Sequence, residues 1–92
     1  MSEPRVLWTI VCERQAEQAL GELRGEILQR IDGAILALAE NPRPHGSQKL
    51  AGAGDFYRIR VWDWRIIYPI EDDRLVVLVI KIAHRREVYR SP

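Results

Sequence analysis

The stretch that decides the fold is Phe-Tyr-Arg-Ile-Arg-Val-Trp-Asp-Trp-Arg, residues 56–65. Its composition is that of a strand, a tight turn and the start of a second strand. Alternate residues of a strand point to opposite faces of a sheet. One face then carries Tyr57, Ile59 and Val61, and the other carries Phe56, Arg58, Arg60 and Trp62.

A two-residue turn at Asp63-Trp64 is predicted, which places Trp62 opposite Arg65 and therefore on the same face. The resulting cluster consists of Arg58, Arg60 and Arg65, flanked by Phe56 and Trp62. Guanidinium groups stay charged and grip phosphate with paired hydrogen bonds, and aromatic rings stack on unpaired bases. The pattern indicates an RNA-binding surface that could also be catalytic. The alternative is a solvated strand face whose arginines keep the sheet soluble.

The size and composition of the chain indicate one domain spanning residues 1–92 with a modest core. Because 47% of the residues are hydrophobic, disorder is not expected. The apolar run at residues 75–80 is too short to span a bilayer, and no signal peptide is recognisable, so a cytoplasmic protein without membrane association is predicted. The lone Cys12 suits a reducing compartment and is interpreted as a small buried hydrophobe.

Charge is distributed unevenly along the chain. The net charge is only +1, but eight of the fourteen basic residues lie from Arg58 onward. Most acidic residues of that half fall at positions 71–73, in a predicted turn away from the arginines. Because the local field steers a polyanion more than net charge does, a polyanionic partner is compatible with this sequence.

Apolar residues at helical spacing predict two helices, over residues 13–23 and 26–40, with a break near Gly21 and Gly25. Asn41-Pro42 is expected to end the second helix, because the residue before proline is pushed out of the helical region. Ile31 and Leu38 lie on the apolar stripe of that helix and are predicted to be core residues.

Four strands are predicted, over residues 5–11, 55–62, 65–70 and 75–83. Pro69 cannot donate a ladder hydrogen bond, so a bulge or an unpaired site is expected there. The fold class is therefore α+β: a small, twisted, mainly antiparallel sheet of about four strands. An N-terminal helical hairpin covers one face and leaves the arginines on the other.

The C-terminal tail contains His84, Arg85, Arg86 and Tyr89. These residue types supply proton transfer and charge stabilisation, the two tasks required when a 2′-hydroxyl attacks its neighbouring phosphate. The alternative is a charged turn with Tyr89 packed against the sheet. Cys12, His45 and His84 lack the spacing of metal ligands, and no metal or cofactor is predicted.

The order of these motifs resembles the RelE/ParE toxin superfamily over almost the whole chain, and is most similar to RelE-type mRNA interferases. The specific part lies in the C-terminal half: Lys49-Leu50, Tyr57-Arg58-Ile59-Arg60, Arg65-Ile66-Ile67-Tyr68 and His84-Arg85-Arg86-Glu87-Val88-Tyr89-Arg90. The N-terminal half matches only as a pattern of elements.

The resemblance implies the toxin of a type II toxin–antitoxin system, a ribosome-dependent mRNA endonuclease that uses metal-independent 2′-hydroxyl attack. Its implied partners are a RelB-like antitoxin, the ribosome and mRNA, and the toxin–antitoxin complex is expected to be oligomeric. Two alternatives stay open: a ParE-like inhibitor of DNA gyrase without nuclease activity, and a catalytically degenerate RNA-binding toxin. The ending with its tyrosine favours RelE.

The resemblance also assigns roles by position. Arg58 and Arg60 stand where the best-known RelE enzymes have lysines, and arginine cannot act as a base at neutral pH, so both are expected to be electrostatic. The further implied catalytic residues are Arg65 on phosphate, Arg85 near the leaving group and Tyr89 as base, with His84 as the competing base. His84 or Arg86 could share the role of Arg85. The expected RNA-binding residues are Lys49, Phe56, Trp62 and Arg86.

Overall fold

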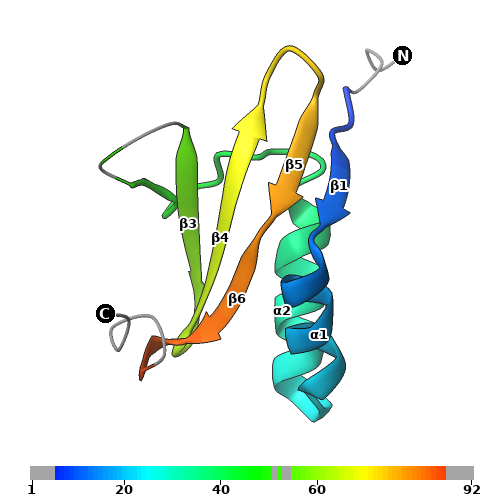
Figure 1. The fold of residues 1–92 in the computed structure, drawn as a ribbon, viewed down its shortest axis with the longest axis vertical. Helices are drawn as coiled ribbons and strands as arrows, with labels where there is room; N and C mark the ends of the chain where they lie inside the picture. The colour runs from blue at the N-terminus through cyan, green and yellow to red at the C-terminus, as the bar shows by residue number, and fades with distance from the viewer. Residues whose placement is uncertain (1–5, 51, 53–54, 87–92) are drawn as a thin grey trace.

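The fold combines two helices with a mixed sheet (Figure 1). A computed structural model describes residues 6–50, 52 and 55–86. In chain order, the elements are β1 (Thr9–Cys12), α1 (Arg14–Glu22), α2 (Gly25–Ala37), β2 (Gln48–Lys49), β3 (Phe56–Val61), β4 (Trp64–Glu71), β5 (Val76–Val79) and β6 (Lys81–His84). The predicted α+β class, with both helices preceding the main strands, is confirmed.

The helical hairpin turns over two residues, Leu23 and Arg24. Leu23 is buried, and the Arg24 guanidinium donates to the carbonyl oxygens of Gly21 at 2.7 Å and Leu23 at 2.8 Å. These bonds satisfy carbonyls that the end of α1 leaves without helical partners. Gly25 then adopts φ +69°, a conformation that glycine accepts without strain. Neither helix of the described chain is long and apolar enough to span a bilayer.

Both helices pack on one face of the sheet, α1 against β6 and α2 against β3. Ile31 and Leu38 are completely buried, as predicted, and Ile35 lies between them on the same stripe. They join the sheet residues Ile59, Ile66, Tyr68, Ile70, Val77, Val79 and Ile82 in one core. α2 ends at Ala37, three positions before the predicted boundary, and residues 38–40 continue as turns.

Ile31→Ala is expected to lower the free energy of unfolding by about 2–5 kcal/mol, because it opens a cavity in a close-packed core. Leu36→Ala is the matched control on the same helix, since Leu36 is 61% exposed. That change should stay within about 0.5 kcal/mol of the wild type. Urea titration of both variants measures the difference, and equal losses would place Ile31 outside the core.

The sheet has the strand order β1-β5-β4-β3-β2, with β6 also paired to β4. β1 and β5 are parallel, and every other pairing is antiparallel. The prediction of a mainly antiparallel sheet therefore holds, but the number of strands is larger than predicted. β2 forms inside the predicted loop, and the predicted strand 75–83 is divided into β5 and β6.

The division between β5 and β6 is a β-bulge. Ile70 of β4 is opposite Val77, whereas Ile67 is opposite Lys81. Two residues of β4 thus face three residues of the β5–β6 segment, and Pro69 is one of the two. The irregularity predicted at Pro69 is confirmed. Its consequence is that the side-chain alternation changes phase at Ile80.

Cys12 lies in β1 and is half-buried against the core. Burial raises the pKa of its thiol, and the carboxylates of Glu17 and Asp32 raise it further. The thiol is therefore protonated at neutral pH, and it packs as a small hydrophobe, as predicted, although less deeply.

Candidate RNA-binding and catalytic face

The turn between β3 and β4 consists of Trp62 and Asp63, one position earlier than predicted. Trp62 takes a positive φ of 55°, a conformation more common for Asn or Gly, which is why its residue type did not signal the turn. The register pairs Arg60 with Arg65. The prediction paired Trp62 with Arg65, so the observed register differs by two residues, and an even shift leaves the faces of both strands unchanged.

Arg58, Arg60 and Arg65 therefore leave the same side of the sheet, opposite the helices. We call this side of the sheet, which carries these three residues, the arginine face. Arg58 donates to Oε1 of Gln48 on β2, and Nε of Arg60 donates to the carbonyl oxygen of Trp62 at 3.2 Å. The predicted geometry is confirmed, and neighbouring groups hold two of the guanidinium groups in place.

Arg65 differs from the other two because it is only 6% exposed, whereas an open face was expected. The reason is its position on β4, where Arg60 of β3 flanks it on one side and Ala83 of β6 on the other. A shielded guanidinium acts through a lower effective dielectric than an exposed one, so its attraction for a phosphate is stronger. Arg65 is thus the most shielded charge of the face.

Lys81 is a further cation of this face that sequence reasoning missed. It is opposite Ile67 in the register of β6 with β4, and Ile67 shares its side with Arg58 and Arg65. Simple alternation from the buried Val79 would have sent Lys81 toward the helices. The bulge reverses that assignment, and only the pairing with β4 reveals it.

The beginning of the tail is attached to the β3–β4 turn. The Arg85 backbone N–H donates to the carbonyl oxygen of Asp63 at 2.6 Å, and its Nε lies 3.9 Å from the Asp63 carboxylate. The Arg85 side chain is exposed, as is Arg86. Tyr89, the predicted base, lies outside the described residues. The chain therefore leaves β6 beside the hairpin that carries Arg60 and Arg65.

His84 is not brought together with the arginines. It is opposite Trp64, whose ring lies edge-on to the imidazole at a centroid distance of 5.6 Å. Trp64 is itself opposite Val61 and packs against the core, so His84 belongs to the side of the helices. The bulge between β5 and β6 is the physical cause, because it changes the face to which His84 points.

The expected RNA-binding residues are also divided between the two sides. Phe56 shares the arginine face, because it is opposite Pro69. Lys49 is opposite Tyr57 on the other side and forms an ion pair with Asp55 at 3.3 Å. Trp62 lies in the turn, where the guanidinium carbon of Arg30 sits 4.7 Å from its ring centroid.

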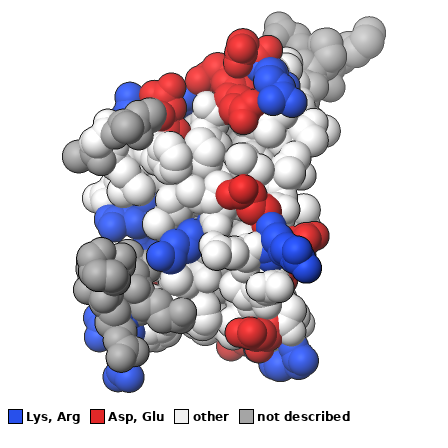
Figure 2. Space-filling model, in the orientation of Figure 1, with Lys and Arg blue, Asp and Glu red and all other residues white. Residues whose placement is uncertain are grey.

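The acidic residues 71–73 lie away from the arginines of the hairpin. Figure 2 shows acidic side chains gathered at the upper end, where β4 turns into β5, with others at mid-height and at the lower end, and basic side chains at mid-height on the side of β3. The separation predicted for residues 71–73 is thus present in space. Asp63 lies in the β3–β4 turn instead, and it pairs with Arg85.

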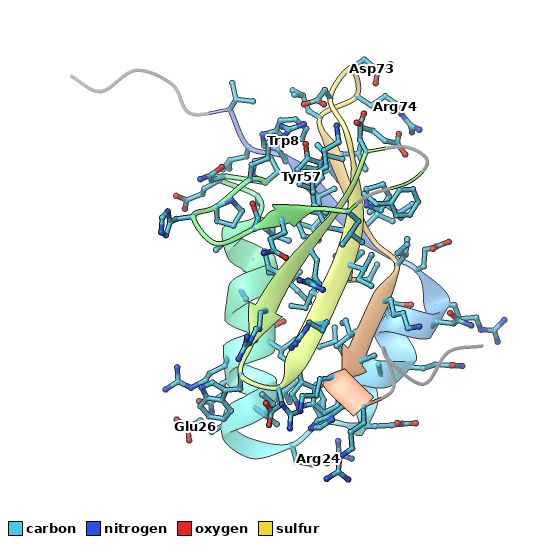
Figure 3. The ribbon with its side chains drawn as sticks, turned by 90° about the vertical axis from the view of Figure 1, so that its left-hand side faces the viewer. Trp8, Arg24, Glu26, Tyr57, Asp73 and Arg74 are labelled. Atoms are coloured by element: carbon cyan, nitrogen blue, oxygen red, sulfur yellow. The ribbon has the colours of Figure 1, made fainter. Side chains whose placement is uncertain are left out.

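A polar cluster at the opposite end of the sheet was not predicted. Arg43 binds both carboxylate oxygens of Asp72, at 3.2 and 3.0 Å, and donates to Oη of Tyr57 at 3.1 Å. The Tyr57 ring stacks on Tyr68, whose hydroxyl donates to the Pro42 carbonyl at 2.8 Å. Figure 3 places Tyr57 toward the same end of the molecule as Asp73 and Arg74. This cluster ties the loop after α2 to the sheet.

Tyr68→Phe is expected to lower stability at neutral pH by about 1–3 kcal/mol, because it leaves the Pro42 carbonyl without its donor. Burial raises the pKa of Tyr68 to about 12, above the value near 10 of an unfolded chain. Stability from this group is therefore complete below pH 10 and is lost as the pH rises through 12. Urea titrations from pH 8 to 12 should show a steeper fall for the wild type than for Tyr68→Phe; parallel curves would contradict the shift.

Comparison with known proteins identifies the family of the chain. Residues 10–89 match the family described as the ParE toxin of the type II toxin–antitoxin system parDE. The chain belongs to this family of RelE/ParE-type toxins. Among curated sequences, it is 28% identical over 76 residues to a putative toxin RelE1 of Methanocaldococcus jannaschii, covering 79% of this chain and 84% of that one.

Solved structures of RelE toxins share the fold. The archaeal RelE–RelB complex of Pyrococcus horikoshii matches with a TM-score of 0.77 and 27% identity, over 86% of this chain and 96% of the other. The RelBE2 toxin–antitoxin complex of Mycobacterium tuberculosis matches with a TM-score of 0.76 and 23% identity, over 91% and 98%. The resemblance to RelE is thus confirmed for the fold.

Proposed function

We propose that this toxin is a ribosome-dependent mRNA endonuclease that cleaves by attack of a 2′-hydroxyl on the adjacent phosphate. The observation that carries the proposal is the register of the β3–β4 hairpin, which places Arg58, Arg60 and Arg65 on one side of the sheet. Phosphate recognition requires convergent fixed cations, and this face supplies them beside the ring of Phe56.

The chemistry assigned to the face is electrostatic. When the 2′-oxygen attacks, negative charge accumulates on the phosphate oxygens, and preorganised cations stabilise it. Arg65 is assigned to this charge because it lies between two strands, and Arg58 and Arg60 to the flanking phosphate oxygens. Arg85 is assigned to the negative charge on the departing 5′-oxygen, which takes its proton from water. The products are a 2′,3′-cyclic phosphate and a 5′-hydroxyl end.

The base that removes the 2′-hydroxyl proton is proposed to be Tyr89. A phenol ordinarily titrates near pH 10, and neighbouring arginines favour its phenolate. The position of His84 against Trp64, on the side of the helices, argues against histidine as the base. Arginine stays protonated at neutral pH and cannot replace either.

The proposal is tested with purified toxin in a reconstituted translation system. We expect cleavage of the message on ribosomes, fragments that end in 2′,3′-cyclic phosphate or its opened form, and no cleavage of the same message without ribosomes. Primer extension with and without ribosomes locates the cuts, and treatment of the fragments with polynucleotide kinase, which removes a 2′,3′-cyclic phosphate, identifies their 3′ ends. Intact message together with inhibited protein synthesis would contradict the proposal and favour an RNA-binding toxin without nuclease activity.

A second function has a specific observation in its favour, because the family match is to the ParE description. Under that alternative, the chain binds DNA gyrase and has no nuclease activity of its own. Accumulation of gyrase-linked DNA breaks beside intact message would establish it. The convergent arginines and the similarity to RelE1 favour the endonuclease.

The proposed protein partner is a RelB-like antitoxin that joins the toxin in an oligomeric complex. Support comes from the solved relatives of Pyrococcus horikoshii and Mycobacterium tuberculosis, which are toxin–antitoxin complexes. Co-expression with the product of the adjacent reading frame, followed by co-purification and light scattering, tests both the partner and the stoichiometry.

A further inference from the structure

A trough runs between α2 and the outer edge of β3, on the far side of Arg60 from Arg65. It consists of two hollows, of about 470 and 430 Å³, that share the residues Ala34, Arg60, Val61 and Trp62. One hollow extends to Pro44, His45 and Gly46 in the loop after α2, and the other to Gln29, Arg30 and Gly33 on the helix. We call this feature the α2–β3 trough.

The trough exists because β3 has an uncovered edge. β2 pairs with β3 only at Tyr57 and Arg58, and within the described residues no strand lies outside Ile59 to Val61. Small side chains on the facing side of α2, Ala34 and Ala37, leave the space open. The floor is therefore apolar, and the exposed edge of the strand runs beside it.

The rim of the trough is aromatic and cationic. Trp62 is 51% exposed, and the Arg30 guanidinium stacks over its ring at 4.7 Å. Glu26, which binds Arg30 at 3.2 Å, fixes this guanidinium. Arg60 and His45 line the remaining wall, and the described lining residues include no Asp or Glu. An exposed ring with cations around it is the arrangement that stacks an unpaired base and attracts its phosphate.

Arg60 connects the trough to the arginine face. It is opposite Arg65 in the hairpin register, yet it also lines both hollows and donates to the Trp62 carbonyl. The arginine face and the trough therefore adjoin at Arg60.

We propose that the α2–β3 trough binds one unstacked RNA base, which lies against the Trp62 ring beside the phosphate held at the arginine face. This inference rests on the proposed action on RNA and adds a base-binding subsite to it. The base comes either from the message or from ribosomal RNA, since the chemistry of stacking is the same for both.

The test measures binding of the purified toxin to a fluorescent oligoribonucleotide with 2′-deoxy substitutions, which cannot be cleaved. Trp62→Asn removes the ring and keeps a residue that tolerates positive φ. Loss of one stacked base predicts weaker binding by roughly 5- to 150-fold. Trp62→Phe should retain most of the affinity, and Leu36→Ala, an exposed apolar change on α2 outside the trough, should retain all of it.

Two further arms separate the sources of the base. If the base belongs to the message, an abasic nucleotide beside the protected position weakens wild-type binding to the level of Trp62→Asn. If it belongs to ribosomal RNA, the free oligonucleotide binds both proteins equally, and Trp62→Asn weakens binding to ribosomes that carry no message. Equal binding in every arm overturns the inference, as does an effect of Trp62→Asn confined to antitoxin binding.

The inference and the proposed function can fail separately. If the wild-type toxin leaves message intact while Trp62→Asn still loses RNA affinity, the proposed nuclease activity is excluded and the base-binding subsite is supported. If the wild-type toxin cuts message and Trp62→Asn binds RNA with the same affinity and cuts it at the same rate, only the base-binding subsite is excluded. Thermal melting of each variant confirms that it is folded before binding is compared.

Discussion

Arg65→Gln is expected to reduce message cleavage on programmed ribosomes by about 10²–10³-fold, the usual effect of removing one group that stabilises transition-state charge. Glutamine keeps a hydrogen-bonding end and much of the side-chain volume but lacks the charge. The large effect follows from the position of Arg65, which is 6% exposed and flanked by β3 and β6, so solvent does not readily take its place. Single-turnover rates measure the loss without interference from product release.

The matched control for Arg65 is Arg74→Gln, an identical change at an exposed arginine in the β4–β5 turn that pairs with Glu71 at 3.0 Å. It should cut message at the wild-type rate. Because Arg65 is buried, its own replacement will also cost stability, and the melting temperature of both variants has to be measured. If Arg65→Gln melts as early as Leu38→Ala and a folded fraction still cleaves normally, Arg65 is structural.

Tyr89→Phe is expected to slow cleavage by about 10²–10⁴-fold, the contribution of a positioned general base. Phenylalanine keeps the ring and removes only the ionisable hydroxyl, so ribosome binding and the fold should be retained. The rate of the wild type should rise with pH as the phenol ionises, and the variant should lack this rise. Single-turnover cleavage across a pH series provides the measurement.

His84→Gln is the control for the base, because the imidazole lies edge-on to Trp64 on the side of the helices. It is expected to change the rate much less than Tyr89→Phe. A normal rate for Tyr89→Phe with a nearly inactive His84→Gln would assign the base to histidine. Full cleavage rates for both variants would show that neither Tyr89 nor His84 is the essential base.

Much of the fold could be predicted because the apolar pattern is clear where it matters. The stretch at residues 56–65 alternates strictly, so the shared face of Arg58, Arg60 and Arg65 followed even though the turn was misplaced by one residue. Moving a two-residue turn by one position changes the register by two residues, so each side chain stays on its predicted face. The stripe on α2 was equally plain, and Ile31 and Leu38 are buried as expected.

The rest depended on contacts between distant segments. Residues 75–80 are apolar at every position, so alternation there carries no information, and the bulge at Ile80 could not be read from it. The burial of Arg65 and the bonds from Arg43 to Asp72 and Tyr57 likewise follow from strand order and loop path. Residue type alone does not give either.

The bulge between β5 and β6 has a consequence for how this chain can vary. Substitutions near Ile80 change one side chain, but adding or deleting one residue there exchanges the faces of everything that follows in the strand. Lys81 would turn toward the helices and Ile82 toward solvent, while β1 and β5 stayed in register. The length of this short segment is therefore under tighter constraint than its composition, and it sets the direction in which the tail leaves the sheet.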